Sequence, residues 1–302
     1  MPPVSVSAPQ SSDDLASRSL PIRFRAYLAE RFPLGSYTTL ISLFFLAGYL
    51  AAQALADTSP LLIGPRALAG FGVIFGAFLV LRFLDEFKDY DLDLKIHPDR
   101  LGSRGVIRLT ELGILAGVVS AVMLALSVSL GLAAAEWCGG VLFMLVLLWR
   151  EFFIPRLLGK SYAVFAAAHQ LLHPALVGFC FACWAAPTGR ALVTAGLYSL
   201  FAAFSFLAFD VGRKLLPAHL ERDGYDTYSS MYGMRQAVWL GMVLLAAASV
   251  CLAAMTWTLG AAAWVYPGIA VAWLLSVWGF VSFSRSPDER HAGQLKNFAS
   301  IN

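Results

Sequence analysis

The stretch PRALAGFGVIFGAFLVLRFLDEFKDYDLDLK, residues 65–95, joins a long apolar run to a dense group of acids. Residues 65–84 are long enough, at about 20 residues, to cross a bilayer as a helix. Five carboxylates follow within nine residues: Asp85, Glu86, Asp89, Asp91 and Asp93. On a helix, Glu86, Asp89 and Asp93 share one face, and Asp85 joins Asp89 one turn away. Such like charges repel, and their hard oxygens suit Mg²⁺, so the stretch predicts a metal site at a membrane edge.

The composition indicates a polytopic membrane protein. Of the 302 residues 59% are hydrophobic and 14% charged, and the mean hydropathy is +0.69. A soluble domain carries roughly a quarter charged residues. We therefore predict an all-α membrane bundle of eight to nine transmembrane helices around a central cavity. The eight spans found are 37–56, 65–84, 108–132, 137–154, 162–185, 190–209, 236–257 and 261–283, with a tight hairpin at Ala133–Glu136.

The sequence predicts polar tails at both ends of the chain and buried cysteines between them. Residues 1–20 lack the apolar core of a signal peptide and are rich in Ser, Pro, Asp and Ala, which predicts a disordered cytosolic tail. Residues 21–285 form one transmembrane domain, and 286–302 a cytosolic tail. Cys180 and Cys183 make a CxxC with no second ligand pair, so we interpret them as small buried core residues.

Basic residues predict the orientation. Lys and Arg gather before the first span, in the polar stretches 85–107 and 210–235, after the fourth span and at the C-terminus, whereas the other side has only Arg66 and Arg190. By the positive-inside rule both termini and both polar stretches are cytoplasmic. We expect an integral protein of the bacterial inner membrane.

Acids and bases are interleaved in these two polar stretches, which we interpret as loops. Over half of the 19 acids lie in 85–99 and 210–226. Charged loops at a membrane edge are common, but two of them after spans two and six suggest two four-span halves that carry matching sites. Acids that hold Mg²⁺ beside Arg and Lys suit a diphosphate leaving group, because negative charge builds on it as its C–O bond breaks.

The first loop resembles the opening motif of the UbiA superfamily of intramembrane prenyltransferases, N-D-x-x-D-x-x-x-D. Here it reads Asp85-Glu86-x-x-Asp89-x-x-x-Asp93, followed by Lys95 and by a run from His97 to Gly105. The second loop is similar to the family's second region through Gly224-Tyr225-Asp226-Thr227-Tyr228. It departs from the family's D-x-x-x-D, because Leu216 or Pro217 and Leu220 or Glu221 stand where the aspartates are expected.

The resemblance implies a site with the following roles. The metal ligands would be Asp85, Glu86, Asp89, Asp93, Asp210 and Glu221, with Asp89, Asp93 and Asp210 catalytic. The groups binding the diphosphate would be Arg82, Lys88, Lys95, Arg100, Arg213, Lys214 and Tyr228. Arg82 stands one turn before Asp85 and Glu86, so pairing with Glu86 is an equal alternative for it.

Several further residues allow more than one interpretation. His169 and His173, at i and i+4, suggest a metal pair, a polar cavity lining or hydrogen-bonded packing. Arg150 and Glu151 suggest an interface ion pair or cavity-facing charges. Phe201, Phe204, Phe206 and Phe209 would pack against helices or lipid, or line a prenyl tunnel.

The sequence therefore predicts a Mg²⁺-dependent intramembrane prenyltransferase that ionises an isoprenoid diphosphate and transfers the prenyl group to an unidentified acceptor. A terpene cyclase of the same superfamily is the first alternative, because the motifs do not distinguish intramolecular from intermolecular capture. A non-enzymatic transporter of divalent cations or lipids is the second. The expected partners are the diphosphate and the bilayer; no pattern for nucleic-acid binding occurs.

Overall fold

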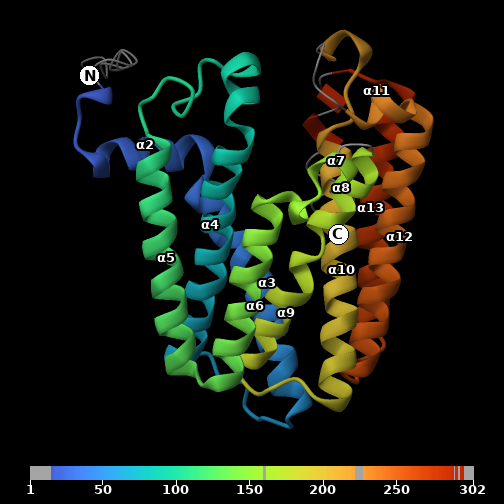
Figure 1. Cartoon of the computed structure of the whole chain (residues 1–302). Helices are drawn as coiled ribbons and strands as arrows, with labels where there is room; N and C mark the ends of the chain where they lie inside the picture. The colour runs from blue at the N-terminus through green and yellow to red at the C-terminus, as the bar shows by residue number, and fades with distance from the viewer. Residues whose placement is uncertain (1–14, 159–160, 222–226, 289, 292, 296–302) are drawn as a thin grey trace, which may run out of the picture. The chain divides into compact units, whose positions relative to one another are not determined.

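The computed structural model describes residues 15–158, 161–221, 227–288, 290–291 and 293–295, and within these ranges every regular element is a helix (Figure 1). Eight segments are long and apolar enough to cross a membrane: Leu34–Leu55, Pro65–Ile96, Leu109–Leu130, Leu132–Trp149, Tyr162–Ala182, Gly189–Arg213, Met234–Thr258 and Val265–Arg285. The predicted all-α polytopic fold is confirmed. The predicted tails lie mostly outside the described residues.

The helices fall into two compact units, described here separately. Unit 1 contains residues 1–47 and 63–154, and unit 2 contains 48–62 and 155–302, so that α3 (Leu34–Leu55) contributes to both. The boundary near residue 154 agrees with the two four-span halves predicted from the sequence.

Unit 1 is built on α4 (Pro65–Ile96), which packs against α5 (Leu109–Leu130) and α6 (Leu132–Trp149). Gly76 permits a close approach between α4 and α5, because a Cβ there would lie 2.8 Å from the Met123 side chain. The helix α2 (Leu20–Arg31) precedes α3, and the short η1 (Glu151–Phe153) follows α6.

The turn between α5 and α6 corrects the predicted hairpin at Ala133–Glu136, since those four residues lie inside α6. The chain reverses at Gly131, whose φ of 121° is in a region that disfavours other residues. Ala-rich segments such as 133–135 have high helix propensity, whereas glycine tolerates the turn.

The two predicted polar loops are shorter than expected, because the helices continue into them. α4 extends through the acidic run to Ile96 and ends at His97, the residue before Pro98, where the proline ring disfavours helical backbone. α10 (Gly189–Arg213) likewise includes Asp210 and Arg213. The predicted loops 85–107 and 210–235 are therefore wrong in their first residues.

Unit 2 contains α7 (Pro155–Leu158), α8 (Tyr162–His169), α9 (Leu172–Ala182), α10, η2 (Ala218–Leu220), α11 (Tyr228–Tyr232), α12 (Met234–Thr258) and α13 (Val265–Arg285). The predicted fifth span is broken between α8 and α9. Cys180 in α9 and Cys183 just after it are buried, as predicted.

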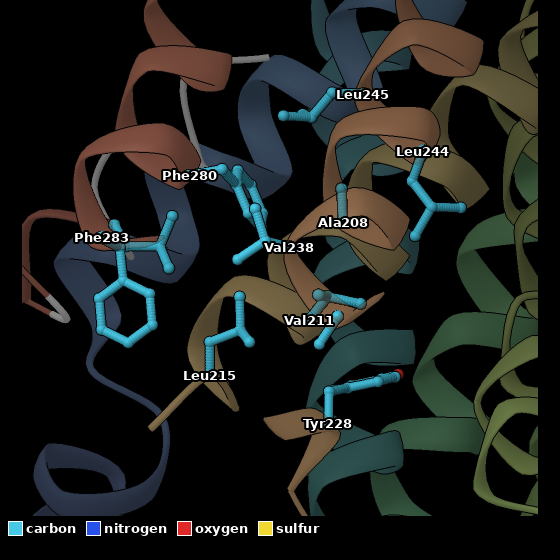
Figure 2. Close-up of a cluster of buried hydrophobic side chains, with 11 residues drawn as sticks. Ala208, Val211, Leu215, Tyr228, Val238, Leu244, Leu245, Phe280 and Phe283 are labelled. Carbon is cyan, nitrogen blue, oxygen red and sulfur yellow. The ribbon is translucent and has the colours of Figure 1, made fainter. Parts of the chain in front are cut away.

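A core cluster joins α10, α11, α12 and α13 (Figure 2). Val211, Tyr228 and Phe280 are fully buried in it. α12 approaches α13 closely at Gly241, where a Cβ would overlap the Phe280 ring. Leu295, beyond α13, is also buried against this cluster, so part of the predicted C-terminal tail packs on unit 2.

Candidate functional site

The end of α4 presents the acids as a helical face. We call residues 85–93 the α4 acidic segment. Because α4 remains helical through it, Asp85, Asp89 and Asp93 follow one another at successive turns, and Glu86 lies beside them. Asp91 is exposed on another side of the helix. The shared face predicted from the spacing is thus confirmed.

Glu86 is buried and bound by three donors. Its Oε1 accepts from Arg31 Nε at 2.7 Å, from Arg82 Nη2 at 2.8 Å and from the Tyr27 hydroxyl at 3.4 Å. The side chain is only 7% exposed, so this carboxylate depends on its counter-ions. Burial, followed by the nearby Glu86 charge, raises the pKa of Tyr27, which keeps its hydroxyl a donor.

Arg82 therefore pairs with Glu86, one of the two roles expected for it. Its Nε is buried and has no acceptor among the described residues. A buried donor without an acceptor costs about 1–3 kcal/mol. An anionic oxygen at this position would satisfy it, so the structure leaves an anion-binding donor at the start of the α4 acidic segment.

Asp93 is held from the loop that follows α4. Arg100 Nη1 lies 2.6 Å from both Asp93 oxygens, and Arg31 Nη2 lies 3.5 Å from Oδ2. The same loop is also bound to α2, because the Leu101 amide donates to the Glu30 carboxylate. The loop turns at Gly105, which has a φ of 68°. Arg100, expected to bind diphosphate, is thus engaged by Asp93.

Asp85 and Asp89 are the less engaged carboxylates. Asp85 has only a long contact, 3.9 Å, to Arg82 Nη1, and Asp89 has no hydrogen bond or ion pair within the described part of the chain. Asp89 lies between two arginine-bound acids one turn away on either side. Its oxygens remain available to a ligand.

The two lysines of this region differ. Lys88 Nζ lies 3.5 Å from Glu151 Oε1, which replaces the Arg150–Glu151 pair expected from the sequence. The Arg150 guanidinium instead lies over the Trp149 and Phe153 rings, at 5.5 and 5.7 Å from their centroids. Lys95 is exposed.

In unit 2, Asp210 is the centre of a second polar group. Its Oδ1 lies 2.7 Å from Arg213 Nη2 and 3.7 Å from Lys214 Nζ. Its Oδ2 accepts from the Tyr162 and Tyr228 hydroxyls at 3.4 and 3.3 Å. Lys214 Nζ also lies 4.5 Å from the centre of the Tyr162 ring. We call these five residues the Asp210 cluster.

The remaining predicted residues of this region surround the cluster. Tyr228 is fully buried, and burial together with the Asp210 charge raises its pKa, so it donates rather than ionises. Glu221 does not contact Asp210 but accepts from Thr227, the N-cap of α11, at 3.2 Å. The Gly224–Asp226 part of the second motif lies outside the described residues.

The α4 acidic segment offers a magnesium ion a small set of oxygen donors. Carboxylate oxygens are the ligands that Mg²⁺ prefers, and Asp85 and Asp89 supply them one turn apart. The fit is limited to this pair and its neighbours, because Glu86 and Asp93 are bound to arginines. Within the described ranges no group of three or more His, Cys, Asp or Glu side chains is arranged to hold a metal.

The histidine pair does not form the helix-face motif considered from the sequence. His169 ends α8 and His173 lies in α9, with the break between them. Their Nδ1 atoms lie 2.8 and 3.2 Å from the carbonyl oxygens of Phe165 and Gln170. These contacts correspond to the third alternative, hydrogen-bonded packing.

Sequence reasoning missed three residues that hold the site. Tyr27 and Arg31 of α2 bind Glu86, and Tyr162 binds Asp210. In the sequence, Arg31 is one of several basic residues that precede the first span. The one signal available was that Tyr27 and Arg31 are spaced i and i+4 and so share a face of α2.

No protein-family model and no curated protein matches this sequence. Solved structures do share its fold. One comes from work on digeranylgeranylglyceryl phosphate synthase in membranes, with a TM-score of 0.64 at 17% identity, covering 92% of this chain and 94% of that one. Another is the apo structure of a UbiA homolog from Aeropyrum pernix K1, with a TM-score of 0.62 at 16% identity, covering 87% and 94%. The chain has the fold of UbiA-type membrane proteins, as the resemblance of its first motif implied.

Proposed function

We propose that this protein is a Mg²⁺-dependent intramembrane prenyltransferase of the UbiA superfamily, which ionises an isoprenoid diphosphate and transfers the prenyl group to an acceptor. The observation that carries the proposal is the α4 acidic segment, in a fold shared with a digeranylgeranylglyceryl phosphate synthase. Among the described residues, Asp89 of this segment has no hydrogen bond or ion pair, and the buried Arg82 Nε has no acceptor.

We assign different roles to different residues of the α4 acidic segment. Asp85 and Asp89 would hold Mg²⁺, which when bound neutralises diphosphate oxygens as their charge grows. Glu86 and Asp93 would hold Arg31, Arg82 and Arg100 in place. Arg82 Nε would then donate to a diphosphate oxygen, which stabilises the leaving group as the C–O bond breaks. Participation of Asp210, Glu221, Arg213, Lys214 and Tyr228 in the same reaction stays a prediction.

The decisive experiment compares two aspartates two residues apart. Purified protein is incubated with geranyl, farnesyl and geranylgeranyl diphosphate and Mg²⁺, and diphosphate release is measured. We expect Asp89→Asn to lower the release rate by at least about 100-fold, because loss of a supporting residue alone costs 10–100-fold at metal sites. Asp91→Asn, at the exposed side of the same helix, should retain it.

The controls make a negative result informative. Chelation with EDTA should abolish release, and added Mg²⁺ should restore it. A folded wild-type protein that releases no diphosphate from any of the three chain lengths would refute the proposal. Divalent-cation flux in liposomes under those conditions would favour a transporter.

A terpene cyclase is the second candidate, favoured by one contact. The Tyr162 ring already receives a cation on its face, from Lys214, and it meets the Tyr228 ring edge-on at 5.1 Å. Such rings stabilise carbocations. Mass spectrometry of the products separates the candidates: a hydrocarbon or terpene alcohol formed without any acceptor identifies a cyclase, and product formation that requires an acceptor identifies a transferase.

A further inference from the structure

Unit 2 carries a groove on α12 and α13, and no residue of the Asp210 cluster is part of its lining. Its part between the two helices has a volume of about 300 Å³ and is lined by residues that include Arg235, Trp239, Met242 and Arg285. A second part, of about 510 Å³, continues along α12 over Trp239 and Val243. Both parts share Arg235 and Trp239, and we call them together the α12–α13 groove.

The two arginines lie at the same end of this groove. α12 and α13 are consecutive and packed together, so Arg235 near the start of α12 and Arg285 at the end of α13 are neighbours in the lining. Both are exposed, and neither forms an ion pair with a described carboxylate. Asp288, the next acid described after Arg285, contacts His291 at 2.8 Å instead.

Apart from Gln236 and Ser284, the remainder of the groove is lined by apolar side chains. Trp239 and Val243 are each 58% exposed, one turn apart on α12. Tryptophan is enriched where the hydrocarbon core meets the headgroups. The lining therefore changes from two cations to an indole and then to aliphatic side chains, which is the order of chemistry along a phospholipid from its phosphate to its acyl chains.

A single arginine at a helix end needs no ligand, because its guanidinium extends to the membrane surface by itself. Two arginines in one groove, with no acid in its lining, repel each other and are complementary to an anion. Basic pockets between transmembrane helices on the cytoplasmic side bind anionic headgroups. The orientation predicted from the basic residues places this end on that side.

We propose that the α12–α13 groove is a binding site for an anionic phospholipid. The phosphodiester is held between Arg235 and Arg285, and an acyl chain lies along Trp239 and Val243. The site is independent of the proposed reaction, since none of its residues belongs to the α4 acidic segment or the Asp210 cluster.

The test is native mass spectrometry of the protein exchanged into nanodiscs that contain equal amounts of phosphatidylglycerol and phosphatidylcholine with identical acyl chains. We expect the wild type to retain phosphatidylglycerol preferentially. The double variant Arg235→Gln with Arg285→Gln should lower this preference by about 25-fold, from about 5-fold for each arginine at a membrane surface. Trp239→Ala should weaken retention of both lipids equally.

Two matched double variants complete the design. Arg156→Gln with Arg190→Gln removes the same charge from exposed positions of unit 2 outside the groove and should retain the wild-type preference. Arg235→Lys with Arg285→Lys keeps both positive charges and should retain most of the preference for phosphatidylglycerol. This variant therefore separates the effect of lost charge from the effect of misfolding. Equal retention of both lipids by the wild type, or equal loss in the two glutamine double variants, would overturn the proposal.

Discussion

Glu86 shows how strongly single residues constrain this site. The resembled motif has an aspartate at this position, and the longer glutamate places its Oε1 within 2.8 Å of both Arg31 and Arg82. A buried carboxylate without counter-ions would lose more in desolvation than it gains from packing. The Glu86 carboxylate therefore binds the Arg31 and Arg82 guanidinium groups and, through Arg31, attaches α2 to α4.

Replacement of Arg31 tests this assignment. Removal of one partner from a buried ion pair costs about 3–5 kcal/mol, and because Arg82 still contacts Glu86 we expect Arg31→Gln to cost about 2 kcal/mol. Thermal unfolding in detergent micelles, followed by tryptophan fluorescence, should show a lower Tm. Arg25→Gln, at an exposed position of α2, is the matched control and should leave the Tm unchanged.

Tyr228 predicts a dependence of stability on alkaline pH. An unfolded tyrosine releases its proton near pH 10. The folded chain retains this proton to higher pH, because burial and Asp210 raise the pKa of Tyr228. Its contribution to the free energy of unfolding is therefore fully present below about pH 10 and declines as the pH rises further.

The variant Tyr228→Phe should lose about 1 kcal/mol at neutral pH, from the hydrogen bond to Asp210. Above pH 10 its stability should decline less steeply than that of the wild type. Equal slopes for wild type and Tyr228→Phe in alkaline unfolding curves would show that Tyr228 does not titrate differently on folding.

Two glycines offer a comparison at the scale of the element. A Cβ at Gly241 of α12 would overlap the Phe280 ring of α13, whereas a Cβ at Gly196 of α10 meets nothing within 4 Å. Overpacking a tight core costs about 1–3 kcal/mol, so we expect Gly241→Ala to destabilise unit 2 by that amount. Gly196→Ala should be neutral or stabilising, by up to about 1 kcal/mol. If unfolding measurements in micelles find Gly196→Ala less stable than Gly241→Ala, the close approach of α12 and α13 at Gly241 is contradicted.

The helices also show where sequence reasoning succeeded and where it failed. Hydropathy located all eight candidate spans of the described residues, because a long apolar run is most favourably placed in the bilayer. The ends were misplaced where polarity was taken for loop structure. Acidic residues 85–93 are compatible with helical backbone, and α4 ends only where Pro98 prevents its continuation. The α5–α6 turn was misplaced because Gly131 carries no hydropathy signal.

At the scale of the whole molecule, eight spans predict that all polar stretches with many bases share one side of the membrane. Single cysteines at Asp99 and His219 should be inaccessible to a membrane-impermeant maleimide in intact cells, and cysteines at Ala186 and Ala263 should react. All four positions are exposed in the structure. The reverse labelling pattern would invert the orientation, and mixed labelling of Asp99 and His219 would contradict the even count of spans between them.

The site was only partly predictable, because its contacts join distant parts of the chain. The spacing of Asp85, Glu86, Asp89 and Asp93 needed only the period of one helix. The contacts of Arg31 with Glu86 and of Tyr162 with Asp210 span 55 and 48 residues, and no local pattern encodes them. The assignment of free and arginine-bound carboxylates therefore required the fold.

The contact between Arg31 and Glu86 has a consequence for the evolution of the fold. A side chain one methylene shorter at position 86 would not reach the guanidinium of α2 in this arrangement, so the two positions constrain each other. Among related sequences, glutamate at position 86 should therefore occur together with arginine at position 31, and aspartate at 86 with a variable residue at 31. An inherited pair of this kind would mark the branch of the fold to which this protein belongs, even where overall identity has fallen too low to reveal it.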